Sequence, residues 1–154
     1  MKEGALFELN GGTISDNIRG YQNGSSITYM NSYGTVTVED GAQMVMTGGS
    51  IENNRDATNY SSGSSAVTVY NDSSSKCSSF TMTGGVIRGN TGASGAVYVR
   101  STKTQCPTAF IMTGGEISGN ENTSGTGGGI RADGYFGELK LTGGVITGNI
   151  SKNS

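Results

Sequence analysis

The stretch FIMTGGEISGN, from Phe110 to Asn120, recurs four more times along the chain. The other copies are LFELNGGTISDN from Leu6, MVMTGGSIENN from Met44, FTMTGGVIRGN from Phe80 and LKLTGGVITGN from Leu139. The first glycines of the five pairs, at positions 11, 48, 84, 114 and 143, are 37, 36, 30 and 29 residues apart. A repeat of this length predicts a solenoid, in which each repeat buries its apolar face against its neighbours.

Besides the Gly-Gly pair, two positions of the repeat never change. Isoleucine follows the first glycine by three residues and asparagine follows it by six, as Ile14, Ile51, Ile87, Ile117, Ile146 and Asn17, Asn54, Asn90, Asn120, Asn149. Stacked coils would bring the isoleucines into one internal column and the asparagines into another, where their amides can bond to one another at the strand spacing of roughly 4.8 Å. We expect the asparagine to stand at a bend, because it tolerates the left-handed region. The asparagine column is therefore predicted to be a structural ladder.

Each repeat predicts three short strands. Apolar residues two and four positions before the first glycine alternate with polar or variable ones, Gly-Gly turns the chain, and the isoleucine begins a second strand. A third apolar pair follows, as Val67 and Val69, Val97 and Val99, Ile130 and Ala132. In the long first connection, residues 18–43, either Ile27 and Tyr29 or Val36 and Val38 could fill that place, and an extra hairpin could project from it.

These strands predict an all-β parallel β-helix of about five coils, in one domain over residues 1–154 with incomplete end coils. An α-solenoid fits poorly, because 27 of the 154 residues are glycine and β-branched residues fill the periodic positions.

Composition excludes several functions. The 10 basic and 12 acidic residues form no run, and no apolar stretch approaches about 18 residues, so we expect neither nucleic-acid binding nor membrane insertion. Histidine is absent, which excludes Ser/His and Cys/His nucleophiles and a His/Cys metal cluster. We expect no cofactor, no metal and no catalysis.

Two cysteines, Cys77 and Cys106, lie 29 residues apart, close to one coil. They should stand nearly above each other on neighbouring coils, at a separation that suits a disulfide. Such a bond would indicate an oxidising, extracellular setting. The alternative is a pair of unlinked thiols in surface loops.

The pattern TGGxIxxN followed by G-x-V-x-V resembles the repeats of bacterial cell-surface and adhesin-like proteins with a right-handed, pectin-lyase-like β-helix. It is also similar to the GG-x-I repeats of polymorphic outer-membrane autotransporter passengers. The resemblance covers nearly the whole chain and implies a right-handed helix at the cell surface or outside the cell. It implies less about activity, since that fold hosts lyases, hydrolases, tail spikes and adhesins.

One outward patch could bind a ligand. Alignment of the third strands brings together Tyr70, Tyr98, Arg100, Arg131 and Asp133. Aromatic faces beside hydrogen-bonding side chains are frequent in carbohydrate- and peptide-binding surfaces, which makes a host or surface glycan a possible partner. The alternative is a set of structural cross-strand pairs, Arg100 with Asp133 and Arg131 against Tyr98.

Other functions have weaker support. A polysaccharide-cleaving β-helix needs clustered carboxylates, but Glu52 shares its column with Arg88, and Glu116 and Asp16 stand apart. The glycine run from Gly125 lacks the Lys-Ser/Thr of a phosphate loop. Ice binding needs flat threonine rows, and the column beside the threonines is irregular and charged.

The ends of the solenoid bear on its partners. Phe7 and Leu9 begin the core close to residue 1, and few residues follow Asn149. We expect the end coils either to stack on other copies of the chain or to meet neighbouring segments of a larger protein. The sequence thus predicts a structural or adhesive surface β-solenoid: a stalk, scaffold or filament-forming segment, with a polysaccharide-binding or polysaccharide-cleaving protein as the alternative.

Overall fold

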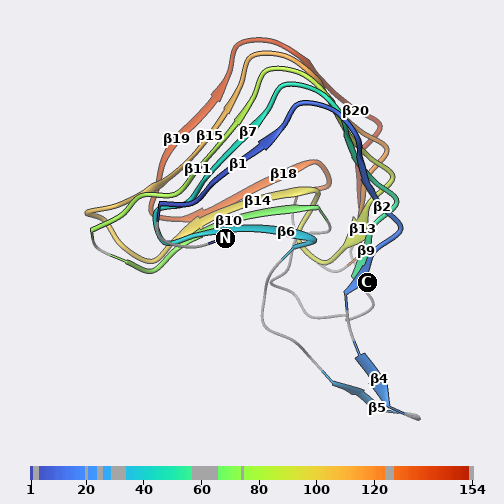
Figure 1. Cartoon of the computed structure of the whole chain (residues 1–154). Coiled ribbons are helices and arrows are strands. Elements are labelled where there is room, and N and C mark those ends of the chain that lie inside the picture. Colours follow the sequence, from blue (N-terminus) through green and yellow to red (C-terminus); the bar gives the residue numbers. More distant parts are fainter. Residues whose placement is uncertain are drawn as a thin grey trace.

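The computed structural model describes residues 1, 4–19, 21–23, 26–28, 34–56, 66–73, 75–123 and 127–152. These residues form strands and turns and include no helix, hence none that could cross a membrane. Successive coils of chain lie on one another and build four parallel sheets (Figure 1). The predicted right-handed parallel β-helix is confirmed.

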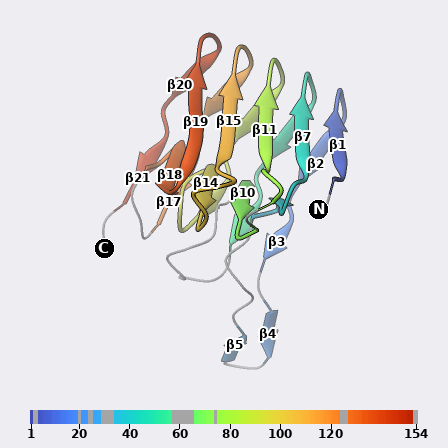
Figure 2. The ribbon, with the colours of Figure 1, turned by 90° about the vertical axis from the view of Figure 1, so that its left-hand side faces the viewer.

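Two of the sheets flank the Gly-Gly corner. The strands before it form the first sheet, β1 (Leu6–Leu9), β7 (Gln43–Met46), β11 (Ser79–Met82), β15 (Thr108–Met112) and β19 (Phe136–Leu141). The strands after it form the second sheet, β2 (Thr13–Ser15), β8 (Ser50–Glu52), β12 (Val86–Arg88), β16 (Glu116–Ser118) and β20 (Val145–Thr147). Figure 2 shows the first sheet from β1 near the N-terminus to β19 near the C-terminus, so the ends of the chain lie at opposite ends of the stack.

A third sheet of two-residue strands adds a short fourth strand to the three predicted for each coil. It contains β3 (Ile18–Arg19), β9 (Arg55–Asp56), β13 (Thr91–Gly92), β17 (Glu121–Asn122) and β21 (Ile150–Ser151). The fourth sheet contains β6 (Val36–Glu39), β10 (Val67–Asn71), β14 (Val97–Ser101) and β18 (Ile130–Gly134).

The long first connection contains the predicted hairpin. Strands β4 (Tyr21–Asn23) and β5 (Ser26–Thr28) pair antiparallel and lie away from the stack (Figures 1 and 2). Val36 and Val38 fill the fourth sheet, opposite Val67 and Val69, so the alternative with Ile27 and Tyr29 is wrong. Tyr29 and Tyr33 themselves lie outside the described residues.

Inward side chains repeat from coil to coil and form a thin continuous core. The register places isoleucine on isoleucine along the second sheet, and Ile51, Ile87 and Ile117 are fully buried. In the first sheet the buried rings of Phe80 and Phe110 stack with centroids 4.9 Å apart. Close packing of like side chains on neighbouring coils thus replaces the globular core of other folds.

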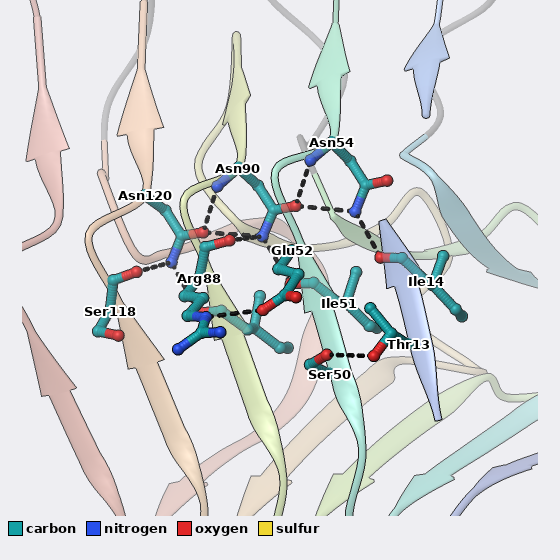
Figure 3. Close-up of polar contacts among 11 residues, drawn as sticks. Thr13, Ile14, Ser50, Ile51, Glu52, Asn54, Arg88, Asn90, Ser118 and Asn120 are labelled. Atoms are coloured by element: carbon teal, nitrogen blue, oxygen red, sulfur yellow. Dashed lines mark hydrogen bonds and ion pairs between the residues drawn. The ribbon is translucent and has the colours of Figure 1, made fainter. Parts of the chain in front are cut away.

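The five asparagines lie in one column along the stack. The Nδ2 of each of the first four donates to the Oδ1 of the asparagine in the next coil, beginning with Asn17 to Asn54 at 2.8 Å. Figure 3 shows the following bond, from Asn54 to Asn90, at 2.9 Å. Asn90 donates to Asn120 at 2.9 Å, and Asn120 to Asn149 at 2.8 Å. The same oxygens also accept the backbone N–H of the preceding asparagine at 3.0 Å. Because Asn54, Asn90 and Asn120 are buried, these bonds satisfy amides that would otherwise be costly to bury.

The Gly-Gly corner requires glycine for two different reasons. Gly115 has a φ of 87°, which side-chain-bearing residues rarely adopt. A Cβ on Gly114 would lie only 2.2 Å from the carbonyl oxygen of Thr83 in the preceding coil. The second glycine is therefore needed for its positive φ, and the first because the backbone of the preceding coil leaves no room for a side chain.

The sequence predicted a left-handed conformation for the ladder asparagine, at the bend after the second sheet. This prediction is wrong, because the left-handed residue is the one before the asparagine. That position holds Asp16, Asn53, Gly89, Gly119 and Gly148, with φ between 55° and 61°. The ladder asparagine is thereby free to direct its amide along the column, since the preceding residue turns the chain.

Cys77 and Cys106 form a disulfide between neighbouring coils, with their Cα atoms 4.8 Å apart. The bond closes a loop of one repeat, with a sequence separation of 29. It links the turns that lead into β11 and β15, so it ties together coils that already share the core.

Replacing Ile117 with alanine is expected to lower the free energy of unfolding by about 2–5 kcal/mol, because it leaves a cavity in a packed column. Denaturant melts of the two proteins measure the difference. Ile111→Ala, on the outer side of β15, is the matched control and should cost less than about 1 kcal/mol. Similar losses at the two sites would contradict an internal isoleucine column.

Replacing Asn90 with aspartate is expected to cost more than about 3 kcal/mol at neutral pH. The change removes the donations from Nδ2 to Ile51 O, Arg88 O and Asn120 Oδ1, at 2.9, 3.0 and 2.9 Å, and buries a charge among these oxygens. Asn17→Asp, at the exposed end of the ladder, should cost only about 1 kcal/mol. Equal destabilisation by both variants, measured by thermal melts, would show that burial of the ladder contributes nothing.

Candidate functional site

A groove of about 540 Å³ lies on the outer side of the fourth sheet, at the ends of β14 and β18. Its walls come from two neighbouring coils and contain Tyr98, Arg100, Ser101, Thr102, Arg131, Asp133, Gly134 and Tyr135. Four of the five residues of the predicted ligand patch line it. The fifth, Tyr70, stands opposite Arg100 on β10 and is not part of the lining.

Three of the lining side chains form one bonded cluster. The Asp133 carboxylate accepts from Arg131 Nη2 at 2.6 Å and from the Tyr98 hydroxyl at 3.1 Å through the same Oδ2 atom. The Arg131 guanidinium lies over the Tyr98 ring, 5.2 Å from its centroid, and donates from Nη1 to Ser94 Oγ at 3.2 Å. These contacts hold each of the three side chains in one position.

The predicted cross-strand pairs are half right. Arg131 does stack on Tyr98, but the expected ion pair between Arg100 and Asp133 is replaced by one within β18, between Arg131 and Asp133. Tyr98, expected on the surface, is only 3% exposed, because it lies beneath the guanidinium. Tyrosine and arginine thus form the floor of the groove.

Arg100 differs from Arg131 in its surroundings. It lies directly opposite Asp133 in the strand register, yet it has no ion-pair partner among the described residues. With Arg131 neutralised by Asp133, the charged lining has a net excess of one positive charge, in a chain whose net charge is −2. An anionic or carboxylate-bearing group would find there a guanidinium able to form two parallel hydrogen bonds.

Sequence reasoning missed Tyr135, which borders the groove and is 55% exposed. Gly134, with a φ of 68°, bends the chain after β18, and a Cβ there would lie 2.3 Å from Ser101 O. The same carbonyl accepts the N–H of Tyr135 at 2.9 Å, so the bend holds the tyrosine against the end of β14. An aromatic residue directly after an Asp-Gly turn was the signal in the sequence.

Two tyrosines near the groove ionise less readily than usual. Burial, and then the neighbouring Asp133 carboxylate, raise the pKa of Tyr98 above its ordinary value of 10.0. Burial and the Asp72 carboxylate likewise raise the pKa of Tyr70. Both phenols are therefore neutral at physiological pH and can act as hydrogen-bond donors.

The described lining contains a single carboxylate, Asp133, and that group is paired with Arg131. Glycoside hydrolysis by the usual mechanisms uses two carboxyl groups about the scissile bond. Elsewhere, Glu52 is paired with Arg88 across neighbouring coils at 2.7 Å (Figure 3). Over the described part of the chain, no three His, Cys, Asp or Glu residues gather in a way that could hold a metal ion.

The glycine run considered as a phosphate loop is a corner leading into β18. Gly127 has a φ of 81°, and a Cβ there would lie 2.4 Å from Ile130 O. Gly125 lies outside the described residues. The described glycines therefore have a conformational reason to be where they are.

Comparison of the chain with protein-family models, with curated proteins and with solved structures finds no match. Any conclusion about function therefore depends on the residues and geometry given above.

A spectrophotometric titration of the tyrosines is expected to show that Tyr98 ionises late. The difference between the curves of the native protein and of the Tyr98→Phe variant should have its midpoint above 10.0, the ordinary value, because burial and Asp133 raise the pKa. The raised pKa contributes stability that is fully present below the unfolded value of 10.0 and is lost as the pH rises through the folded value. Urea-unfolded protein is the control, and a midpoint at or below 10.0 in the folded protein would contradict the buried, carboxylate-bonded phenol.

Proposed function

We propose that this chain is a structural, adhesive β-solenoid of an adhesin-like protein at the cell surface or outside the cell, without catalytic activity. In this proposal the stack of coils is a rigid support, and the groove on the fourth sheet is the adhesive surface. The observation that carries it is the groove itself, where a fixed Arg131–Asp133–Tyr98 floor lies beside an Arg100 with no ion-pair partner among the described residues.

The support function follows from the bonding between coils. The ladder from Asn17 to Asn149 crosses every coil, and the Cys77–Cys106 disulfide ties two coils together. Each coil is thereby bonded to the next through the sheets and the side-chain amides, and two of the coils are also joined by the disulfide. A disulfide of this kind suits an oxidising compartment, which favours an extracellular setting.

The ligand we propose is a saccharide that carries a carboxylate. Arg100 would bind the carboxylate, and the exposed ring of Tyr135 would pack against the apolar face of a sugar ring. Tyr98 and Asp133 would accept or donate hydrogen bonds to hydroxyls at the floor. Binding without cleavage is favoured because Asp133 is the one carboxylate among the described lining residues.

A glycan array probed with the purified chain tests this function, with neutral and carboxylate-bearing saccharides side by side. We expect binding to members of the second group, and a loss of affinity of about tenfold or more in Arg100→Ala, since a charged hydrogen bond contributes about 1.5–3 kcal/mol. Tyr135→Ala should weaken binding as well. Incubation with the bound saccharides should leave their chain lengths unchanged.

The matched control is Arg88→Ala, which removes the same charge from the outer side of the second sheet, away from the groove. It should leave glycan binding intact. Absence of binding to every saccharide, or equal losses in Arg88→Ala and Arg100→Ala, would overturn the adhesive groove. Cleavage of the saccharide would instead favour a polysaccharide-degrading enzyme.

A further inference from the structure

The links from the fourth sheet to the first sheet differ in length from coil to coil. The long turn, residues 102–107, joins β14 to β15, whereas Tyr135 alone joins β18 to β19 in the next coil. Figure 1 shows the links of the middle coils, in green and yellow at the left of the view, reaching beyond the others. Thr102, the first residue of the long turn, is exposed and lines the groove, as does Tyr135. The long turn thus begins in the wall of the groove.

The disulfide holds the other end of the long turn. Cys106 is bonded to Cys77 of the preceding coil. The carbonyl oxygen of Cys106 also accepts from Asn71 Nδ2, and from Ser101 Oγ at 3.3 Å. Asn71 and Ser101 are both buried and stand opposite each other at the ends of β10 and β14. One covalent bond and two hydrogen bonds therefore fix the Cys106 end of the turn to two neighbouring coils.

Ser101 connects this anchor to the groove. Its hydroxyl lies at the centre of the long turn, where it donates to Lys103 O at 3.0 Å and accepts the N–H of Lys103 at 3.0 Å. The N–H of Thr102 donates to Asn71 O at 2.9 Å. On the other side, the Ser101 carbonyl accepts the N–H of Tyr135 at 2.9 Å. One buried residue thus joins the disulfide end of the turn, the wall of the groove and its exposed tyrosine.

The stack has other contacts between the two coils that the disulfide joins. Strands β11 and β15, which follow the two cysteines, pair in register, and the rings of Phe80 and Phe110 stack on each other. The ladder bond from Asn90 to Asn120 joins the same coils. All these contacts remain when the S–S bond is broken. The long turn, by contrast, lies at the surface, so loss of the bond affects the turn more than the stack.

The disulfide can be approached from solvent on one side. Cys77 is exposed, whereas Cys106 is only 3% exposed. A thiolate of a dithiol reductant can attack the Cys77 sulfur, which forms a mixed disulfide and releases the Cys106 thiolate. The second thiol of the reductant then displaces the Cys77 sulfur. The protein gains two thiols, and the dithiol leaves as its own disulfide, so two electrons and two protons pass to the protein.

We propose that the Cys77–Cys106 disulfide is a redox control of the groove. The oxidised form holds the long turn in place and binds the ligand, whereas the reduced form releases the turn and binds weakly. A wall that is ordered before the ligand arrives favours binding, because a released turn must lose conformational entropy when the ligand binds. The ligand in this inference is that of the proposed function, on which it rests, but the coupling between disulfide and wall can be measured without a ligand.

Binding of the whole chain to the carboxylate-bearing saccharides of the glycan array, before and after treatment with dithiothreitol, tests the control. We expect the affinity to fall by about fivefold or more on reduction and to return when the thiols are reoxidised. The circular dichroism of the β-strands should stay the same. A variant with both Cys77→Ser and Cys106→Ser is the control for the reagent, since it should bind like the reduced protein and should not respond to dithiothreitol.

Hydrogen exchange tests the coupling in the absence of ligand. The amide hydrogens of Thr102, Lys103 and Tyr135 are bonded to groups at the ends of β10 and β14. They should exchange about tenfold or more faster after reduction, because local opening of the turn needs less free energy. The amide of Asn90, bonded within the ladder at 3.0 Å, is the internal reference and should exchange at an unchanged rate.

Unchanged exchange in the long turn after complete reduction would overturn the inference, whether or not a saccharide binds. So would equal affinity of the reduced and oxidised proteins, or a disulfide that resists the dithiol in the folded chain. Loss of the β-strand signal on reduction would also overturn it, since the disulfide would then support the whole stack. Absence of binding in both redox states, together with faster exchange after reduction, would count against the proposed function alone.

Discussion

The asparagine ladder is the interaction on which the rest of the structure depends. Each of the three inner ladder amides accepts from the coil before it and donates to the coils on both sides, as Asn90 does with Asn54, Ile51 and Asn120. A slip of one residue between coils would leave these buried amides unpaired, at a cost of about 1–3 kcal/mol for each lost partner. The ladder therefore sets the register in which isoleucine packs on isoleucine and the outer columns face outward.

The glycine corner requires residues without a side chain, whereas the ladder requires one particular side chain. Carbonyl oxygens of one coil approach the next so closely that a Cβ at Gly84 or Gly114 would lie 2.3 or 2.2 Å away, so no other residue fits there. The ladder needs a side chain of one length and one pattern of donors. Both requirements are visible in the sequence as invariance, which is why the repeat alone predicted the first, second and fourth sheets and both internal columns.

Features that vary from coil to coil could not be predicted in the same way. The third sheet could not be predicted from the sequence, because the first position of its strands holds isoleucine, arginine, threonine or glutamate. These residues share no chemical property that a sequence pattern could reveal. The sequence predicted the left-handed bend one residue too late, at the ladder asparagine. Three coils have glycine at the true position, but Asp16 and Asn53 occupy it in the other two, so the position is not invariant. For the site, the alignment brought Tyr98, Arg100, Arg131 and Asp133 together. It could not show that Arg131 would cover Tyr98 and pair along its own strand, since that depends on side-chain rotamers.

The groove lies where the regular solenoid begins to vary. The inward positions of β14 and β18 are apolar, as they are in β10, with Val97 opposite Ile130 and Val99 opposite Ala132. What distinguishes the two strands is their outward residues and the bend at Gly134. Because the ladder and core already determine the register, the outward positions of Arg100 and Arg131 can vary without changing it, and the ligand proposed for the groove would depend on these two side chains.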